Sequence, residues 1–474
     1  MYKVLHISEL STYTKRVLKA PVIRWLLVGI VLGTSSISPW TWWLAIVGLV
    51  LFILIIRQTQ DLKFVLGGSL LVGIVQAFVV YTWFWSLYPL DWIGMSRPAG
   101  AGIIIGVWFL SSLALGIGRV FFGWYVHRVR QNNRALYLGV PFAWVMSELL
   151  GSLIFSLYIL GPGVGITLEY SVSYIGYVLA EHGLLIRLAE LGGVFILSAT
   201  VAATAVYFYR LLTRTKPAIG KIVAIAALVF VTSFIPFTNP YQIDDYVVAA
   251  LGTDYEAYVR LAPEEQRVRQ DNLIQAVADT LSQGVDYVIL PEDARLSSSF
   301  DTPEAVFNFL TSFTDKDVVL VDPAMEWLDD GTKVVVALVY DTKTNSVEKI
   351  YKELLTPGGE YLSYFNGGIL RLLGFSEALD NFNRMYGYKP WPNKTPLPEG
   401  VPEILFCFEG QSSVALWQKA RRSGVPFVAH VVSHSWFKDS KILRHELDQM
   451  LRVNSLFART SVYQAANKSH SMRY

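Results

Sequence analysis

Three residues in the second half of the chain have side chains that could act together in chemistry. Glu292 follows the apolar run Val-Ile-Leu-Pro, Lys352 follows Glu-Lys-Ile-Tyr, and Cys407 lies within Glu-Ile-Leu-Phe-Cys-Phe-Glu. Each stands at the end of a predicted strand, which is where α/β sheets build their sites. A thiol, a carboxylate and an ammonium can supply a nucleophile, a proton acceptor and a positive charge for a developing anion. Taken singly, the three also have plain structural interpretations: a small buried side chain, a solvated turn and a surface charge.

The elements that would position these residues follow from the pattern after about residue 241. Short β-branched runs alternate there with polar helical stretches, which predicts an α/β domain with helices on the sheet faces. The predicted strands are Tyr246–Leu251, Asp286–Leu290, Val318–Val321, Lys333–Tyr340, Ser346–Tyr351, Glu403–Phe408, Pro426–Val432 and Ser461–Ala465. The predicted helices are residues 262–283, 302–314, 411–423 and 439–458.

The first half of the chain has a different composition. Of 474 residues, 53% are hydrophobic and only 16% are charged, against about a quarter charged in soluble domains. Residues 1–240 carry 17 Lys and Arg against 7 Asp and Glu, whereas residues 241–474 carry 23 against 31. We therefore predict a membrane domain over 1–240 and a water-facing domain over 241–474. The seven apolar runs of about spanning length are residues 21–38, 39–57, 63–86, 100–125, 136–160, 185–210 and 218–237.

Lys and Arg gather in alternate connections between these runs. They occur in the N-terminal tail and in the second, fourth and sixth connections, whereas residues 161–184 contain none. Because basic residues favour the cytoplasmic side, the N-terminus is predicted to be cytoplasmic. Seven crossings then leave residues 241–474 outside.

Two carboxylates fall inside the predicted spans. Glu148 and Glu190 would be costly at membrane depth unless they face a cavity or a partner. A structural role near helix ends is the alternative interpretation.

Composition also excludes several classes of protein. The basic residues are not gathered on the water-facing part, which argues against nucleic-acid binding. One cysteine rules out an intrachain disulfide framework and a cysteine-based zinc site. His430, His434 and His445 show no accompanying ligand geometry, so we predict no metal and no cofactor.

Taken together, the motifs around the three reactive residues resemble a known superfamily. Pro291-Glu292, then Tyr351-Lys352 with Pro-Gly-Gly-Glu-Tyr at 357–361, then Cys407-Phe-Glu are similar to the Glu-Lys-Cys triad of carbon–nitrogen hydrolases, or nitrilases. With the preceding membrane spans, the chain resembles the apolipoprotein N-acyltransferases. Three further stretches agree with this family: Leu188-Ala-Glu-Leu-Gly-Gly-Val-Phe195, Ser433-His-Ser-Trp-Phe-Lys-Asp-Ser440 and Asn467. It differs from the family pattern at Gly358, Phe408 and Lys468-Ser469.

The resemblance implies a fold and a mechanism. The fold would be a polytopic helical membrane domain followed by an extracytoplasmic nitrilase-like αββα sandwich. Cys407 would be the nucleophile, Glu292 the general base, and Lys352 the charge that compensates the thiolate and the oxyanion. Glu360 would orient the lysine, and Glu409 would help to position the acceptor amine.

The resemblance also implies the substrates. A phospholipid would donate an acyl chain to the N-terminal amine of an S-diacylglyceryl-cysteine lipoprotein by ping-pong chemistry without a cofactor. The protein would be a monomeric, multi-pass protein of the bacterial cytoplasmic membrane.

Aromatic residues suggest where lipid would bind. Residues 355–402 interrupt the strand–helix alternation and are rich in glycine and aromatic residues, which is unusual for a solvated loop. We predict that this insertion acts as a lid and membrane-contacting arm; packing on the α/β core is the alternative. Trp83 and Trp85 would line a lipid entrance or belong to an aromatic belt. The candidate substrate-binding residues are Trp83, Trp85, Tyr364, Phe365 and Phe375.

Two other functions stay open at this stage. A membrane-tethered amidase or nitrilase would keep the triad but would not need a lipid-facing aromatic insertion. A catalytically inactive binding or assembly module is favoured by the end of the sequence at Tyr474. The closing strands and final membrane helix expected of the family are missing there, so the domain is expected to be truncated.

Overall fold

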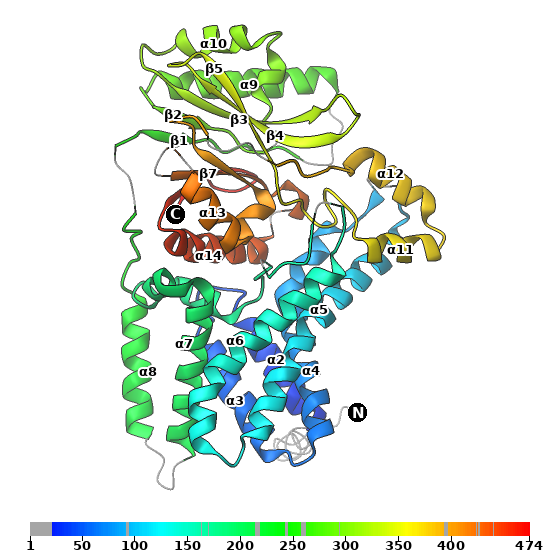
Figure 1. Ribbon diagram of the computed structural model, residues 1–474, viewed down its shortest axis with the longest axis vertical. Helices are drawn as coiled ribbons and strands as arrows, with labels where there is room; N and C mark the ends of the chain where they lie inside the picture. Colours follow the sequence, from blue (N-terminus) through cyan, green and yellow to red (C-terminus); the bar gives the residue numbers. More distant parts are fainter. Residues whose placement is uncertain are drawn as a thin grey trace, which may run out of the picture.

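A computed structural model shows a helical part and an α/β part stacked along the long axis of the molecule (Figure 1). It describes residues 21–474 except 92–93, 163, 169, 214–218, 242–244, 257–261, 293, 393–396, 423, 425–426 and 439. The basic N-terminal tail, on which the predicted orientation partly depends, therefore lies outside the described residues, as does most of the sixth connection.

Apolar helices occupy all seven predicted runs of the first half. Four of them, Leu62–Leu87, Arg97–Arg128, Asn133–Tyr158 and Leu185–Leu212, are long and apolar enough to cross a membrane. The other three are shorter, so the number of crossings stays a prediction. The elements are α2 (Pro21–Thr34), α3 (Leu44–Gln58), α4 (Leu62–Val80), η1 (Tyr81–Leu87), α5 (Arg97–Arg128), α6 (Asn133–Tyr158), η3 (Ile175–Glu181), η4 (Leu185–Leu188), α7 (Ala189–Leu212) and α8 (Ile219–Ser233).

Small residues let the central helices approach closely. A Cβ atom on Gly73 of α4 would meet the backbone oxygen of Gly116 on α5 at 2.5 Å. A Cβ atom on Gly118 of α5 would likewise collide with the backbone oxygen of Ser147 on α6. Such contacts are typical of helices that pack within a membrane, where van der Waals contact replaces the hydrophobic effect.

The second half contains two separate sheets. The first has the order β1-β2-β3-β4-β5, with β1 to β3 parallel and β3 to β5 antiparallel. The second has the order β6-β7-β8-β9, with a final antiparallel pair. The strands are β1 (Val248–Ala250), β2 (Tyr287–Ile289), β3 (Val319–Trp327), β4 (Lys333–Asp341), β5 (Ser346–Tyr351), β6 (Glu403–Phe406), β7 (Phe427–Ser433), β8 (Ser461–Asn467) and β9 (Met472–Arg473). All eight predicted strands are present, and among the described residues the short β9 is the one strand that the pattern did not predict.

The two sheets pack face to face, and helices cover their outer faces. Ile289 and Val321 of the first sheet share one buried core with Phe406 and Ala429 of the second. Helices α9 and α10 contribute to the core on the outer face of the first sheet, and α13 and α14 to that of the second. These helices are α9 (Pro263–Leu281), α10 (Pro303–Thr311), α13 (Ser413–Arg422) and α14 (Lys441–Ala458), close to the four predicted ranges.

Helix α14 also joins the α/β part to the membrane part (Figure 1). Met450, Val453 and Leu456 of α14 belong to the same buried cluster as residues of the membrane helices. Helix α14 therefore packs against both the second sheet and the membrane helices.

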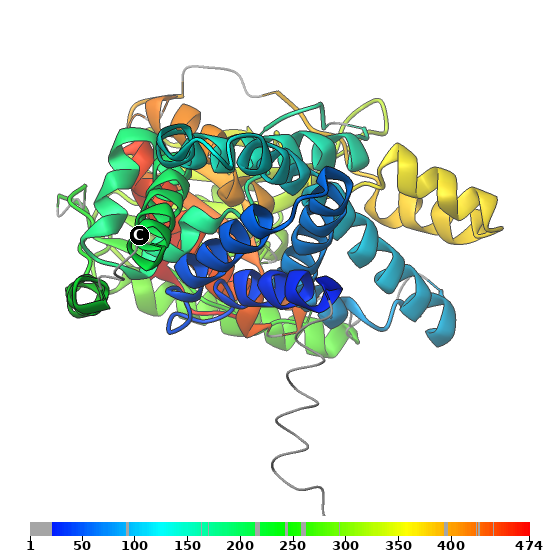
Figure 2. The ribbon, with the colours of Figure 1, turned by 90° about the horizontal axis from the view of Figure 1, so that it is seen from below.

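The aromatic insertion contains two helices, which the sequence pattern did not predict. They are α11 (Tyr364–Leu372) and α12 (Ser376–Tyr386). Both project from the side of the molecule, beside the upper end of α5 (Figures 1 and 2). Leu372 at the end of α11 is 88% exposed.

Candidate functional site

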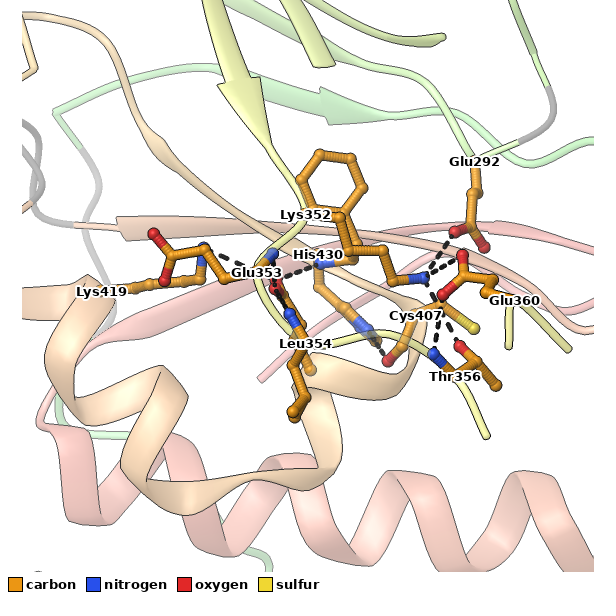
Figure 3. A network of polar contacts seen from close by, with 11 residues as sticks. Glu292, Lys352, Glu353, Leu354, Thr356, Glu360, Cys407, Lys419 and His430 are labelled. Atoms are coloured by element: carbon orange, nitrogen blue, oxygen red, sulfur yellow. Dashed lines mark hydrogen bonds and ion pairs between the residues drawn. The ribbon is translucent and has the colours of Figure 1, made fainter. Parts of the chain in front are cut away.

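The three reactive residues come together from three different strand ends (Figure 3). Glu292 follows β2, Lys352 follows β5, and Cys407 begins the 3₁₀ turn η6 (Cys407–Gln411) directly after β6. Glu292 and Lys352 thus come from the first sheet and Cys407 from the second. The site therefore lies where the ends of the two sheets meet.

Lys352 is the centre of the polar cluster. Its side chain is 1% exposed, and its Nζ lies 2.7 Å from Glu360 Oε1 and 3.1 Å from Glu292 Oε1. Burial opposes the charged form, but the two carboxylates and Cys407 together raise the pKa of Lys352 well above its ordinary value. The lysine is therefore a fixed positive charge at neutral pH.

Glu360 holds this lysine in place from a turn eight residues further on. While one carboxylate oxygen contacts the ammonium, the other accepts the backbone N–H of Thr356 at 2.7 Å. Two contacts on one carboxylate leave it little freedom to rotate. That Glu360 orients the lysine for a reaction stays a prediction.

Cys407 sits in an unusual backbone conformation. Its φ is +35°, a left-handed value that non-glycine residues seldom adopt. The side chain is half-buried, and its sulfur lies beside Lys352 and Glu360 (Figure 3). Burial, followed by Glu292, raises the pKa of the Cys407 thiol well above its ordinary value, whereas Lys352 and the backbone N–H of Ser433 favour the thiolate.

Glu409 occupies a place different from the one we expected. It is 1% exposed, and its Oε1 accepts the backbone N–H groups of Glu353 and Leu354 at 2.8 and 3.0 Å. Its Oε2 accepts the N–H of Phe406 at 3.0 Å. The carboxylate thus ties the chain after Lys352 to the turn that carries the thiol. These contacts do not support the predicted role at an acceptor amine.

Two buried residues in this region were not predicted to contact the reactive residues; His430 was considered only as a metal ligand. Lys419 of α13 lies 3.5 Å from Glu409 Oε2 and compensates its charge. His430 of β7 places Nε2 3.1 Å from the carbonyl oxygen of Cys407 and Nδ1 3.0 Å from Gln464 Oε1. Burial lowers the pKa of His430, so the ring is neutral at neutral pH. Both of its nitrogens are used within the protein, and among the described residues no group of histidine, cysteine or carboxylate side chains is arranged to hold a metal ion.

The predicted lipid-binding aromatic residues have varied surroundings. Trp83 donates Nε1–H to Glu446 Oε2 at 3.2 Å and packs edge-on to Phe437, so it joins η1 to the α/β part. Trp85 is 45% exposed. The structure therefore separates Trp83, an interface residue, from Trp85 at the surface.

The insertion shows the same division. Phe375 packs beside the cluster of Leu90, Met95 and Ile104. By contrast, Tyr364 and Phe365 are exposed, although the ring of Phe365 still contacts a ring of α6. Phe375 therefore helps to hold the insertion to the membrane part, and lipid binding by Tyr364 and Phe365 stays a prediction.

Fold and site together define a class of protein: a helical membrane domain that carries an α/β domain with a Glu-Lys-Cys cluster. Residues 29–207 match the family model for the apolipoprotein N-acyltransferase N-terminal domain. The membrane part therefore resembles the N-terminal domain of the apolipoprotein N-acyltransferases. The match does not extend into the α/β part. No curated protein sequence matches the chain at a significant level.

Proposed function

We propose that the protein moves a fatty acyl chain from a membrane phospholipid to the N-terminal amine of an S-diacylglyceryl-cysteine lipoprotein, through a thioester on Cys407. The observation that carries the proposal is the buried ammonium of Lys352, held by Glu292 and Glu360 beside the chain's only thiol. The family of the membrane domain supports the choice of substrates. The four-layer order of helices and sheets supports a nitrilase-like sandwich for residues 241–474.

The first half-reaction forms the thioester. Glu292 takes the proton of the Cys407 thiol as the sulfur attacks the ester carbonyl of the phospholipid. Lys352 compensates the negative charge on the tetrahedral oxyanion. The carbon–oxygen bond then breaks, and Glu292 returns the proton to the departing lysophospholipid hydroxyl.

The second half-reaction transfers the acyl chain to the lipoprotein. Its free amine attacks the thioester carbonyl, Glu292 takes a proton from the amine, and an amide bond forms as the carbon–sulfur bond breaks. The same proton then neutralises the Cys407 thiolate. The raised thiol pKa fits this cycle, because the resting residue is a protonated thiol that needs a base.

Both substrates are anchored in a membrane, which requires the site to lie close to the bilayer. We propose that the α/β part is extracytoplasmic, with the N-terminus inside, because Lys and Arg alternate between connections. Reporter fusions at 132, 175 and 300 should then report inside, outside and outside. A cytoplasmic signal at 300 would refute this orientation and, with it, an outer-leaflet acyl donor.

Intact-mass measurement after incubation with phospholipid vesicles tests the reaction itself. We expect a fatty-acyl adduct on the unsubstituted protein and none on Cys407→Ala, and the adduct should be lost when a diacylglyceryl peptide is added. Loss of the adduct to water alone, without N-acylated peptide, would indicate a hydrolase. A folded protein that never acquires an adduct would be the inactive module.

A further inference from the structure

The turn that carries Cys407 rests on a segment of the membrane part. This segment, residues 170–177 between α6 and α7, is here called the supporting segment. The ring of Tyr170 lies 5.4 Å from the ring of Phe408, the residue after the thiol. Ser171 Oγ lies 3.4 Å from the carbonyl oxygen of Gln411, the last residue of η6. Both ends of the turn thus contact the same segment.

The buried phenol of Tyr177 reinforces the contact between Ser171 and the turn. Tyr177 is 4% exposed, and its Oη lies 2.5 Å from Ser171 Oγ. Asn454 on α14 places Nδ2 3.4 Å from the carbonyl oxygen of Gly410 in η6. Ser171, which Tyr177 contacts, and Asn454 therefore hold the turn at two neighbouring carbonyl groups.

The membrane helices hold the supporting segment from the opposite side. Glu148 Oε1 on α6 accepts the backbone N–H of Ile175 at 2.7 Å, and Ser198 Oγ on α7 accepts that of Gly176 at 3.0 Å. Arg119 on α5 lies 3.8 Å from Glu148 and compensates its charge. Glu148, which the sequence places inside a predicted span, therefore holds the backbone of the supporting segment at Ile175.

The turn needs such support because its backbone is strained. A non-glycine residue at φ +35° persists only where its surroundings hold it. His430 of the second sheet contacts the carbonyl oxygen of Cys407, and the supporting segment packs against the side of the turn that faces the membrane helices. If the turn relaxed, the thiol would move away from the ammonium of Lys352.

We propose that the supporting segment positions the Cys407 turn, with Ser171 and Tyr177 as positioning residues, so that the thiol meets Lys352 only while the α/β part is packed on the membrane helices. This inference depends on the proposed function in that it takes Cys407 as the reactive thiol. It makes the membrane domain part of the catalytic apparatus rather than an anchor alone.

Alkylation of the single cysteine by iodoacetamide tests the proposal in the full-length protein in detergent. Tyr177→Phe keeps the ring and removes the hydroxyl. Because one hydrogen bond contributes about 1 kcal/mol, we expect alkylation near neutral pH to slow about fivefold. The pH profile should move upward by about 0.7 units, the same factor expressed as a pKa. A role in folding alone would change the melting temperature but not this profile.

Tyr174→Phe is the matched control. It removes a buried phenol hydroxyl from the same segment, 2.7 Å from Ser152 Oγ, but Ser152 keeps its own contact with the Tyr170 carbonyl at 2.6 Å. We expect its alkylation rate to stay within about twofold of that of the unsubstituted protein, because this change removes less than one of the hydrogen bonds that hold the turn. Equal shifts in both variants, or no shift in Tyr177→Phe, would overturn the proposal.

Two further measurements separate the possible failures. If Tyr177→Phe does not fold, Ser171→Ala removes only one oxygen and should shift the profile in the same direction; an unchanged profile would overturn the proposal. Acylation by phospholipid is measured in parallel. If the unsubstituted protein never forms an acyl-enzyme while Tyr177→Phe still slows alkylation, the proposed function fails and the positioning role stands. If an acyl-enzyme forms but Tyr177→Phe alkylates and acylates at the unsubstituted rate, the positioning role alone fails.

Discussion

Replacing Glu360 by Gln removes one negative charge from the cluster around Lys352 while keeping the size of the side chain. The carboxylate now accepts from the ammonium at 2.7 Å through Oε1 and from the Thr356 N–H at 2.7 Å through Oε2. An amide has one oxygen and one NH₂ group. In the Gln variant, the amide NH₂ group must therefore face another donor, either the ammonium of Lys352 or the N–H of Thr356.

The size of the effect follows from this lost contact. A hydrogen bond to a charged group contributes about 1.5–3 kcal/mol, which corresponds to about 10- to 150-fold in rate if the contact is needed in the transition state. A second effect acts in the same direction. Freed from Glu360, the ammonium interacts more strongly with Glu292, 3.1 Å away, and makes that carboxylate a weaker base.

The assay is the rate of acyl-enzyme formation by intact mass, with the melting temperature measured alongside. Glu326→Gln is the control, because Glu326 Oε1 also lies 2.7 Å from a lysine, Lys349, but this pair is partly exposed. An exposed pair contributes about 0.2–1 kcal/mol at most, so this variant should acylate at the unsubstituted rate. If Glu360→Gln also acylated at that rate, the ammonium would not need its second carboxylate and the argument would be wrong.

Three further predictions concern the reaction, the insertion and pH. Cys407→Ala should abolish the acyl adduct with the protein still folded, and Glu292→Gln should slow acylation by about 10²–10⁴, the usual contribution of a general base. N-acylation of a lipoprotein substrate by the Cys407→Ala variant would refute the nucleophile assignment. Phe365→Ser should weaken the reaction with long-chain phospholipid more than the reaction with a short soluble ester, at an unchanged melting temperature. Phe375→Ser, which loses packing in a cluster, should lower the melting temperature and slow both reactions alike. Equal effects of the two variants would contradict the proposed lid. Burial raises the pKa of Glu446 well above its ordinary value. The contribution of Glu446 to stability is therefore present below its unfolded-state pKa and is lost as pH rises through its folded-state pKa. Glu446→Gln should raise the melting temperature more at pH 8 than at pH 5, and an equal rise at both would show that Glu446 does not titrate in this range.

The sequence by itself determined the arrangement of elements to a large extent. Seven apolar runs became seven helices, and the eight predicted strands formed the two sheets. These features depend on local periodicity and composition, which a single stretch of chain carries within itself. The three reactive residues were found for a related reason, since each stands at or close to the end of a recognisable strand. Helices α11 and α12 were missed because glycine and aromatic residues hide their short amphipathic pattern.

Only the tertiary structure decided what each polar residue does at the site. From its place two residues after Cys407, Glu409 looked like a substrate contact, yet backbone N–H groups from the end of the other sheet occupy its carboxylate. The support beneath the thiol was equally invisible, because Ser171 and Gln411 are 240 positions apart. A carboxylate or hydroxyl has the same local pattern whether it faces solvent, substrate or backbone. Its partner is chosen by the packing of distant elements, and burial then makes that partner obligatory, because an unpaired polar group inside the protein is costly.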